Sequence, residues 1–175
     1  MLRLILMRHA KSRWRSPGLG DFERPLAERG RRDAPRMGAY LAAAGFVPDV
    51  VLCSSAKRAR QTMKRAIARF SREPELRLMD ELYHAGPDDL LAILRRIDSA
   101  LQTVMIIGHN PGLHAFVLDL IRPGVAAGQH LHDNLEHHFP TAALAVLSFD
   151  VRRWRNLAEA SGKLEDYTAP RLMTG

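Results

Sequence analysis

Short apolar segments alternate with longer segments of helical periodicity, and this alternation restricts the fold more than any other feature of the chain. Residues 2–7 (LRLILM), 49–52 (DVVL) and 103–107 (TVMII) are apolar runs of strand length, and 76–79 (LRLM) is a weaker one. Strands that alternate with helices form a mostly parallel sheet covered on both faces. The sequence therefore predicts a three-layer α/β/α sandwich with a mostly parallel sheet.

Four helices are predicted between and after these strands. Residues 28–44 have apolar positions at helical spacing and are followed by Gly45, a residue suited to the end of a helix. Serine and asparagine are common helix N-caps, and proline is common in the first helical turn. The other three helices are expected to begin near Ser54-Ser55, Gly86-Pro87 and Asn110-Pro111.

The C-terminal part has weaker periodicity. Residues 143–149 (ALAVLSF) and 151–157 (VRRWRNL) indicate a closing hairpin around Asp150. The Gly- and His-rich stretch 123–140 is expected to be a loop, and the tail after Gly162 to be irregular. No repeat or linker divides the chain, so residues 1–175 are predicted to form a single domain.

Composition and charge limit the class of protein. The hydrophobic fraction is 46% and the charged fraction 26%, as in ordinary soluble proteins. The N-terminal run LRLILM is much shorter than a membrane span and lacks a signal-peptide cleavage pattern, so we expect a cytoplasmic protein without membrane contact. The net charge of +7 suits anionic partners, and the aromatic content of 6% favours phosphorylated substrates over nucleic acid.

Polar residues follow three of the predicted strands at the point where each strand ends. They are Arg8-His9-Ala10, then Cys53-Ser54-Ser55 with Arg58 shortly after, and Gly108-His109-Asn110-Pro111. Ligands of parallel sheets bind in the crevice beyond the carboxyl ends of the strands. Each segment alone fits a turn, a cap or a polar strand exit. Their coincidence at three strand ends indicates one common site.

Two imidazoles and two guanidiniums in one crevice suit phosphoryl transfer. Arginine presents a planar fork of donors that matches phosphate oxygens and keeps its charge. A neutral histidine can attack phosphorus and form a covalent intermediate. Preorganised donors must hold the charge of the transferring group, and a helix that starts near Pro111 would point its positive dipole end at it. The residues predict a phosphatase that uses neither a metal nor another cofactor.

Six stretches cover nearly the whole chain in the order of one known family: LILMRHAKSRW (4–14), DFERPLAERG (21–30), VLCSSAKRARQT (51–62), LYHAGPDDLL (82–91), VMIIGHNPGL (104–113) and FPTAALAVLSF (139–149). The chain resembles the histidine phosphatase superfamily, which is related to phosphoglycerate mutase, and within it the short bacterial phosphohistidine phosphatases of the SixA type. Its RHA motif stands where the family more commonly has RHG.

The resemblance implies a phosphoglycerate mutase-like fold in which His9 is the phosphorylated nucleophile. It also implies that Arg8, Arg58 and His109 form the phosphate pocket around His9. The implied substrate is phosphohistidine on a partner protein, with a small phosphorylated molecule as the alternative. A mutase is less compatible with the chain, because a single predicted helix connects strands 76–79 and 103–107 and no long insertion encloses the crevice.

Two further site residues are weaker candidates. Superfamily mutases and several phosphatases use a carboxylate general acid, and the most similar position here is Glu81 in MDELYHAG; a surface ion pair explains Glu81 equally well. Ser12 follows the His9 loop closely enough to contact phosphate. Asn110 is interpreted as a helix cap, and Thr141 as a structural residue in preference to one that faces the pocket. Asp80 is an alternative acid, as are Asp88 and Asp89, which better fit a first helical turn.

Other residues imitate known sites without matching them. The gaps from Cys53 to Arg58 and Arg60, four and six residues, do not fit the tyrosine-phosphatase loop, so Cys53 is interpreted as a buried strand-end residue. No H-E-x-x-H pattern accompanies the clustered histidines, which are attributed to a polar loop. These are His130, His132, His137 and His138, while His84 and His114 are attributed to structural or exposed positions.

Two other classes of function remain open from the sequence. One is a phosphate-binding module without activity, which the presence of both His9 and His109 disfavours. The other is a basic nucleic-acid-binding protein, which would need a continuous Lys/Arg stripe on one surface and would bind with a steep salt dependence.

Overall fold

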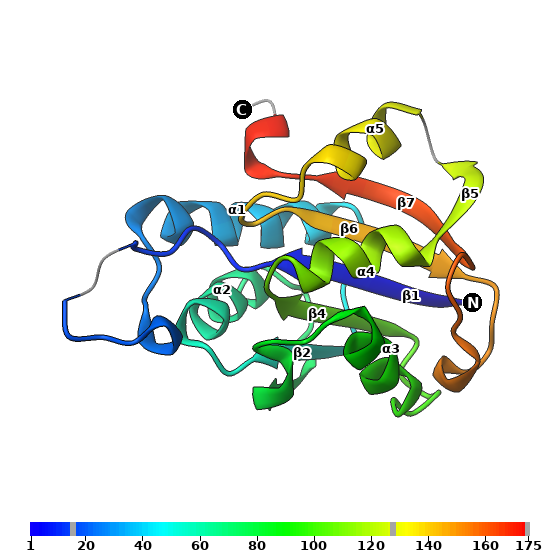
Figure 1. The fold of residues 1–175 in the computed structure, drawn as a ribbon, viewed down its shortest axis with the longest axis horizontal. Coiled ribbons are helices and arrows are strands. Elements are labelled where there is room, and N and C mark those ends of the chain that lie inside the picture. Colours follow the sequence, from blue (N-terminus) through cyan, green and yellow to red (C-terminus); the bar gives the residue numbers. More distant parts are fainter. Residues whose placement is uncertain (15–16, 127–128, 174–175) are drawn as a thin grey trace.

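Figure 1 shows a computed structural model of the chain, which describes residues 1–14, 17–126 and 129–173, with the backbone alone for 123–126 and 129–132. One seven-stranded sheet runs through the molecule in the order β3-β2-β4-β1-β6-β7-β5. Of these strands, β6 is antiparallel to both of its neighbours, and the other pairings are parallel. The strands are β1 (Leu2–Arg8), β2 (Val50–Ser54), β3 (Glu75–Met79), β4 (Thr103–Gly108), β5 (Ile121–Ala126), β6 (Leu144–Phe149) and β7 (Gly162–Thr168).

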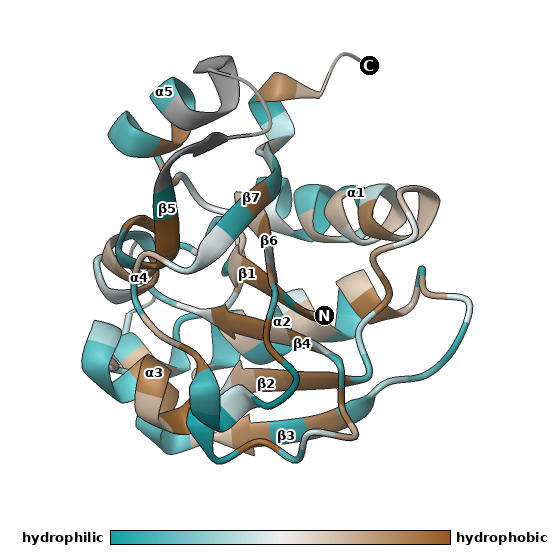
Figure 2. Cartoon of the chain, turned by 90° about the vertical axis from the view of Figure 1, so that its right-hand side faces the viewer, coloured by the Kyte–Doolittle hydropathy of each residue, from teal (hydrophilic) through white to brown (hydrophobic). Residues whose placement is uncertain are grey.

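Helices cover both faces of this sheet, which confirms the predicted three-layer sandwich (Figures 1 and 2). The helices α1 and α2 pack together on one face, and α3 and α4 pack on the other. The α-helices are α1 (Glu28–Ala43), α2 (Lys57–Ile67), α3 (Pro87–Arg95), α4 (Gly112–Leu120) and α5 (Gln129–His137). Short 3-10 helices are η1 (Asp21–Glu23), η2 (Asp80–Leu82), η3 (Trp154–Asn156) and η4 (Pro170–Leu172).

The central strand β1 divides the core between the two faces. Leu4 and Leu6 belong to the apolar cluster beneath α3 and α4, whereas Ile5 and Met7 belong to the cluster beneath α1 and α2. All four side chains have no exposed surface. Successive residues of a strand point to opposite faces, so an unbroken apolar run fits a strand that is covered on both sides.

The predicted strand at 151–157 is wrong. Its apolar residues Val151, Trp154 and Leu157 repeat every three positions, and the segment forms the 3-10 turn η3, with the Trp154 indole buried and donating a hydrogen bond to the Leu101 carbonyl at 2.6 Å. The strand that pairs with β6 on the side away from β1 is instead β7, in the tail predicted to be irregular. Pairing of β7 with two strands compensates for its largely polar composition.

The stretch 123–140 is likewise more regular than the predicted loop. It includes most of β5, at the edge of the sheet, and the helix α5, whose Leu135 is fully buried against the core. The strand β5 depends on its pairing with β7, which is distant in sequence, because the Gly and Pro of β5 weaken the local signal for a strand. In the described part of the chain, no helix combines the length and hydropathy that crossing a membrane requires.

Candidate active site

The carboxyl ends of β1, β2 and β4 meet at one edge of the sheet and bring the predicted site residues together. Arg8 at the end of β1 pairs with Gly108 at the end of β4, so His9 and His109 leave the sheet side by side. Their ring centroids are 5.1 Å apart. Parallel neighbours present the same end at the same edge, which is why residues distant in sequence converge here.

His9 is held in one tautomer by its surroundings. Its Nδ1 lies 2.8 Å from the Ala10 carbonyl oxygen, which can only accept, so Nδ1 carries the proton. Its Nε2 therefore has a free lone pair, which accepts a hydrogen bond from Arg58 Nε at 3.3 Å. Burial, with smaller contributions from nearby positive charge, lowers the pKa of His9 to about 3. The ring is therefore neutral at neutral pH, with Nε2 facing Arg58.

His109 is neutral for a similar reason. Burial and the charge of Arg58 lower the pKa of His109 to about 4. Its Nδ1 lies 3.4 Å from the Nη2 of Arg58, which can only donate, so the proton of the neutral ring is on Nε2. This Nε2 donates to the hydroxyl oxygen of Ser54 at 2.8 Å.

Arg58 connects both histidines to the loop before α1. Its side chain is 6% exposed, and its Nη1 and Nη2 donate to the Asp21 carbonyl at 2.8 Å and the Asp21 carboxylate at 3.1 Å. The Tyr83 hydroxyl donates to the same carboxylate. The hydrogen bond from Tyr83, together with Arg58 and Arg24, lowers the pKa of Asp21 to about 2 against the opposing effect of burial.

Arg8 lies across the pocket and is held from the side of β6. Its Nη1 donates to the Phe139 carbonyl at 3.1 Å, and burial, followed by the charge of Arg58, lowers its pKa. Asn110 Nδ2 donates to the same carbonyl at 2.8 Å. The interpretation of Asn110 as a helix cap is wrong, because α4 has Pro111 at its cap position and receives no side-chain hydrogen bond there.

Two buried polar atoms at this site have no hydrogen-bond partner among the described residues: Arg8 Nε and Asn110 Oδ1. Buried donors are nearly always paired. The buried Arg8 Nε is therefore a donor that the described residues leave unpaired. A cavity of about 260 Å³ opens beside His109 and Asn110, with Tyr83 and His84 in its wall.

Ser12 and Glu81 make contacts outside this cluster. The Ser12 hydroxyl accepts a hydrogen bond from Arg24 at 3.1 Å, and Ser12 also forms a backbone bridge to Leu26. The Glu81 carboxylate forms an exposed ion pair with Arg96 at 3.1 Å, in an adjoining concavity that shares Tyr83 and His84 with the cavity beside His109. Their roles as phosphate ligand and general acid stay predictions. Thr141 does not line the cavity beside His109 but lines one against α1.

Several residues of the cluster were not identified from the sequence. Ser54, which the sequence predicts only as a helix cap, ends β2 and pairs with His109. Asp21 and Tyr83 lie in segments without a strand-end signal, and they meet Arg58 only through tertiary contacts. Thr62, four residues after Arg58 on α2, links the Arg58 carbonyl at 2.8 Å to the Ala10 amide at 3.0 Å.

The remaining candidates take no part in the cluster. Burial raises the pKa of the Cys53 thiol to about 12, so this thiol is no nucleophile at neutral pH. The half-buried His114 contacts the Leu135 carbonyl at 2.7 Å, a structural contact between α4 and α5. The side chains of His130 and His132 lie outside the described residues. Among those described, no group of three or more His, Cys, Asp or Glu side chains is arranged to hold a metal ion.

Comparison with known proteins gives consistent relatives. The model of the histidine phosphatase superfamily (branch 1) matches residues 4–84. A crystal structure from Agrobacterium tumefaciens, provisionally identified as the phosphohistidine phosphatase SixA, is similar at a TM-score of 0.80 and 32% identity, covering 97% of this chain and 98% of its own. An uncharacterised protein of Mycobacterium tuberculosis is 33% identical over 166 residues, which are 94% of this chain and 100% of that protein. The protein histidine phosphatase SixA complexed with tungstate shares the fold, with a TM-score of 0.76, 21% identity, and coverage of 97% and 98%.

Proposed function

The chain belongs to the histidine phosphatase superfamily, and from this membership we propose that it removes phosphate from phosphohistidine on a protein, without a metal, through a covalent intermediate on His9. The observation that most supports the proposal is the state of His9. Its ring is buried and neutral, its Nδ1 proton is held by the Ala10 carbonyl, and its Nε2 lone pair lies beside Arg58. A nucleophile of this kind needs no base to remove a proton before it attacks.

The donors around His9 suit the charge that develops on a transferring phosphoryl group. Arg8 and Arg58 would donate to the equatorial oxygens, and His109 would join them as a donor once its Nδ1, which accepts from Arg58 in this structure, takes up a proton on substrate binding. Preorganised donors supply most of the catalysis in phosphoryl transfer, because the protein contributes little covalent chemistry of its own. Two guanidiniums at this place supply positive charge that does not depend on pH.

The reaction then needs no carboxylic acid. In the first step a bond forms between His9 Nε2 and phosphorus, while the bond from phosphorus to the substrate nitrogen breaks. A substrate phosphohistidine with a protonated ring leaves as neutral imidazole. In the second step water attacks phospho-His9, its phosphorus–nitrogen bond breaks, and both protons of the water leave with the phosphate. The Ala10 carbonyl stabilises the positive ring of phospho-His9 through its Nδ1 proton.

The state of the carboxylates near the cluster suits a leaving group that needs no proton, such as the imidazole of a protonated phosphohistidine. With a pKa lowered to about 2, Asp21 is ionised at neutral pH and has no proton to give, and Glu81 is paired with Arg96. When an alkyl phosphate is cleaved, the alkoxide that leaves is a strong base and needs a proton donor. The imidazole that leaves a protonated phosphohistidine is neutral and needs none. The connection between β3 and β4 contains η2 and α3 and no further helix or strand, which leaves room for a substrate that projects from a larger body.

A panel of substrates tests the proposal. We expect kcat/KM for a phosphohistidine protein or peptide to exceed that for phosphoserine and phosphotyrosine peptides and for alkyl phosphates. Rapid quenching with radiolabelled phosphohistidine should trap acid-labile, base-stable label on the native chain. His9→Ala should lose this label, and His137→Ala, which changes an exposed histidine, should retain it.

Two outcomes would contradict parts of the proposal. Unchanged label in a folded His9→Ala variant would remove His9 as the nucleophile. A clear preference for a small phosphomonoester would favour the alternative, a small-molecule phosphatase of the same superfamily.

A further inference from the structure

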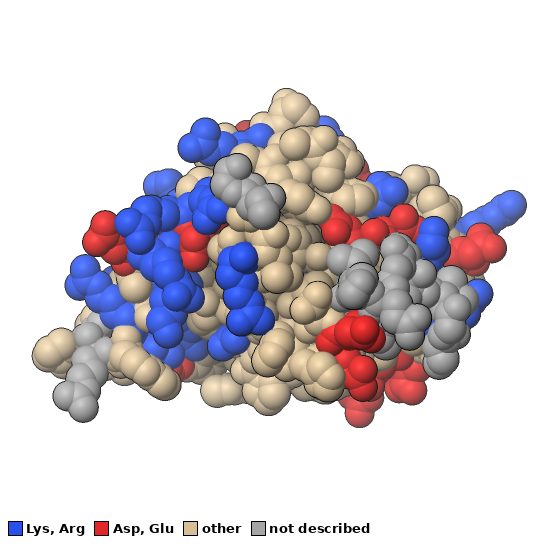
Figure 3. All heavy atoms as spheres, turned by 90° about the horizontal axis from the view of Figure 1, so that it is seen from above, with Lys and Arg blue, Asp and Glu red and all other residues tan. Residues whose placement is uncertain are grey.

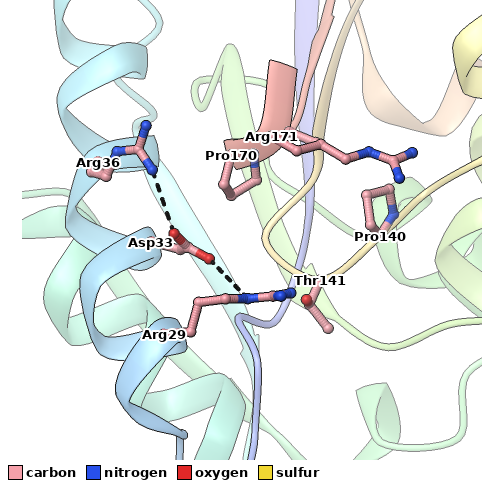
Figure 4. Close-up of a pocket in the computed structure, with 8 residues that line it drawn as sticks. Arg29, Asp33, Arg36, Pro140, Thr141, Pro170 and Arg171 are labelled. Carbon is pink, nitrogen blue, oxygen red and sulfur yellow. Dashed lines mark ion pairs between the residues drawn. The ribbon is translucent and has the colours of Figure 1, made fainter. Parts of the chain in front are cut away.

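A further concavity, of about 360 Å³, lies between α1, the segment Pro140–Thr141 and the 3-10 helix η4 (Figure 4). We refer to it as the α1/η4 pocket. None of its lining residues lines the cavity beside His109. The α1/η4 pocket is therefore distinct from the cavity beside His109, and the proposed reaction does not require it.

One face of α1 supplies the charged wall of this pocket. Arg29, Asp33 and Arg36 are spaced four and three residues apart, so they lie on the same side of the helix. Asp33 is only 7% exposed and lies between the two guanidiniums, at 3.6 Å from each (Figure 4). These distances are longer than hydrogen bonds, so both exposed arginines keep donors that Asp33 does not engage.

A third guanidinium comes from the opposite wall. In Figure 4 the exposed Arg171 of η4 extends over Pro140, across the pocket from α1. None of the three guanidiniums donates a hydrogen bond to another residue of the described part of the chain. Two guanidiniums thus flank the Asp33 carboxylate, and the third lies at the opposite rim of the pocket. Lys and Arg also gather on the side of the molecule shown at the left of Figure 3.

The same chain segment connects this pocket to the phosphate site. The Phe139 carbonyl accepts a hydrogen bond from Arg8, and the amide of Ala142 donates to the carbonyls of Arg8 and His9 at 3.2 and 3.1 Å. Between these two anchor points, Pro140 and Thr141 line the α1/η4 pocket. A macromolecule whose phosphorylated side chain enters the site at His9 therefore has this pocket within reach of its neighbouring surface.

We propose that the α1/η4 pocket binds acidic side chains of the phosphoprotein substrate next to its phosphohistidine, an inference that rests on the proposed function. The guanidinium fork matches a carboxylate through two parallel hydrogen bonds. Arg29 and Arg36 are held near their positions by Asp33, which reduces the entropy lost when a partner carboxylate binds. The pocket thereby selects among phosphohistidine proteins by the charge beside the modified residue.

Paired phosphohistidine peptides of equal length test this inference. One peptide of each pair has a run of glutamates and the other a run of glutamines, at successive distances on either side of the phosphohistidine. The native chain should show the higher kcat/KM for the glutamate peptide at the best distance. The combined change Arg29→Gln, Arg36→Gln and Arg171→Gln should reduce this preference by about tenfold or more, since exposed ion pairs contribute up to about fivefold each.

Two further variants separate local from general effects. A control variant removes the same number of positive charges at exposed positions outside the pocket, by the changes Arg32→Gln, Arg69→Gln and Arg152→Gln. This variant should keep the preference for the glutamate peptide. Asp33→Asn removes the negative charge of the pocket at nearly constant shape and should increase the preference. Hydrolysis of free phosphohistidine, which has no neighbouring residues, should be the same in all of these proteins.

The results also distinguish the inference from the proposed function. A native chain that hydrolyses both peptides equally well would overturn the inference alone. An equal fall in preference in both triple variants would show a general charge effect, and a parallel loss on free phosphohistidine would show a structural role; each would overturn it. No turnover of any phosphohistidine substrate by the native chain would refute the proposed function and this inference together.

Discussion

At the scale of single residues, the chemistry of His9 depends on two atoms of its surroundings. The Ala10 carbonyl holds the proton on Nδ1, and burial next to Arg58 keeps a second proton off Nε2. A buried imidazole near positive charge loses its tendency to ionise, because its charged form is poorly solvated and repelled. The same conditions that favour nucleophilic attack therefore also make the folded state sensitive to acid.

This sensitivity can be measured as the pH dependence of stability. The pKa of His9 is lowered from 6.5 to about 3 in the folded state, so below about pH 6.5 the unfolded chain binds a proton that the folded chain does not. The free energy of unfolding should therefore fall with pH from about 6.5 down to about 3, by up to about 1.4 kcal/mol per pH unit for this one group. His9→Asn, which cannot ionise, should fall less steeply over this range. Equal slopes for both proteins in chemical denaturation would contradict the lowered pKa.

The role of Glu81 can also be tested with a single substitution. If it is the general acid that the resemblance implies, Glu81→Gln should reduce kcat/KM for an alkyl phosphate far more than for phosphohistidine, because proton donation helps a poor leaving group most. Arg96→Gln breaks the same ion pair and is the matched control. Equal, small changes in both variants and for both substrates would assign Glu81 to its surface ion pair alone.

At the scale of elements, the helices α1 and α2 hold the loop that contains His9. From α2, Thr62 accepts a hydrogen bond from the Ala10 amide and donates one to the Arg58 carbonyl, so the loop and the arginine are positioned together. From α1, the first turn approaches the loop so closely that a Cβ on Gly30 would lie 2.2 Å from the Lys11 carbonyl oxygen. No side chain other than hydrogen fits between the two backbones.

Gly30→Ala should therefore move α1 away from the His9 loop. We expect a loss of about 1–3 kcal/mol in the free energy of unfolding, as for other overpacked positions, together with reduced kcat. Gly20→Ala is the control, because a Cβ at Gly20 meets no atom within 4 Å and its φ of −69° suits alanine. Unchanged melting temperature and turnover in Gly30→Ala would show that the contact is unimportant.

At the scale of the whole molecule, one sheet edge collects the charge needed for phosphoryl transfer. Arg8 leaves β1, Arg58 lies in the first turn of α2 after β2, and the N-terminal end of α4 follows β4. Their positive charge and the helix dipole are supplied by the fold itself. Under the proposed function, this arrangement would hold a phosphoryl group without a metal ion.

Turnover should accordingly be unchanged after exhaustive dialysis against EDTA. The measurement is kcat for phosphohistidine hydrolysis before and after dialysis, and after addition of Mg²⁺ or Zn²⁺. A loss that a divalent ion restores would show that the guanidiniums do not suffice, and would direct attention to the histidines of α5 and the residues around it.

The sequence by itself determined the layers of the molecule and the meeting of His9, Arg58 and His109. Both follow from short-range patterns, because an unbroken apolar run such as residues 4–7 (LILM) fits a strand covered on both faces, and parallel strands end at one edge. Tertiary structure alone decided the role of the polar strand β7, which its pairing with β6 and β5 stabilises. It also decided the contacts of Asp21, Tyr83 and Asn110, since these side chains meet Arg58 and Phe139 across the chain and no local periodicity encodes such contacts.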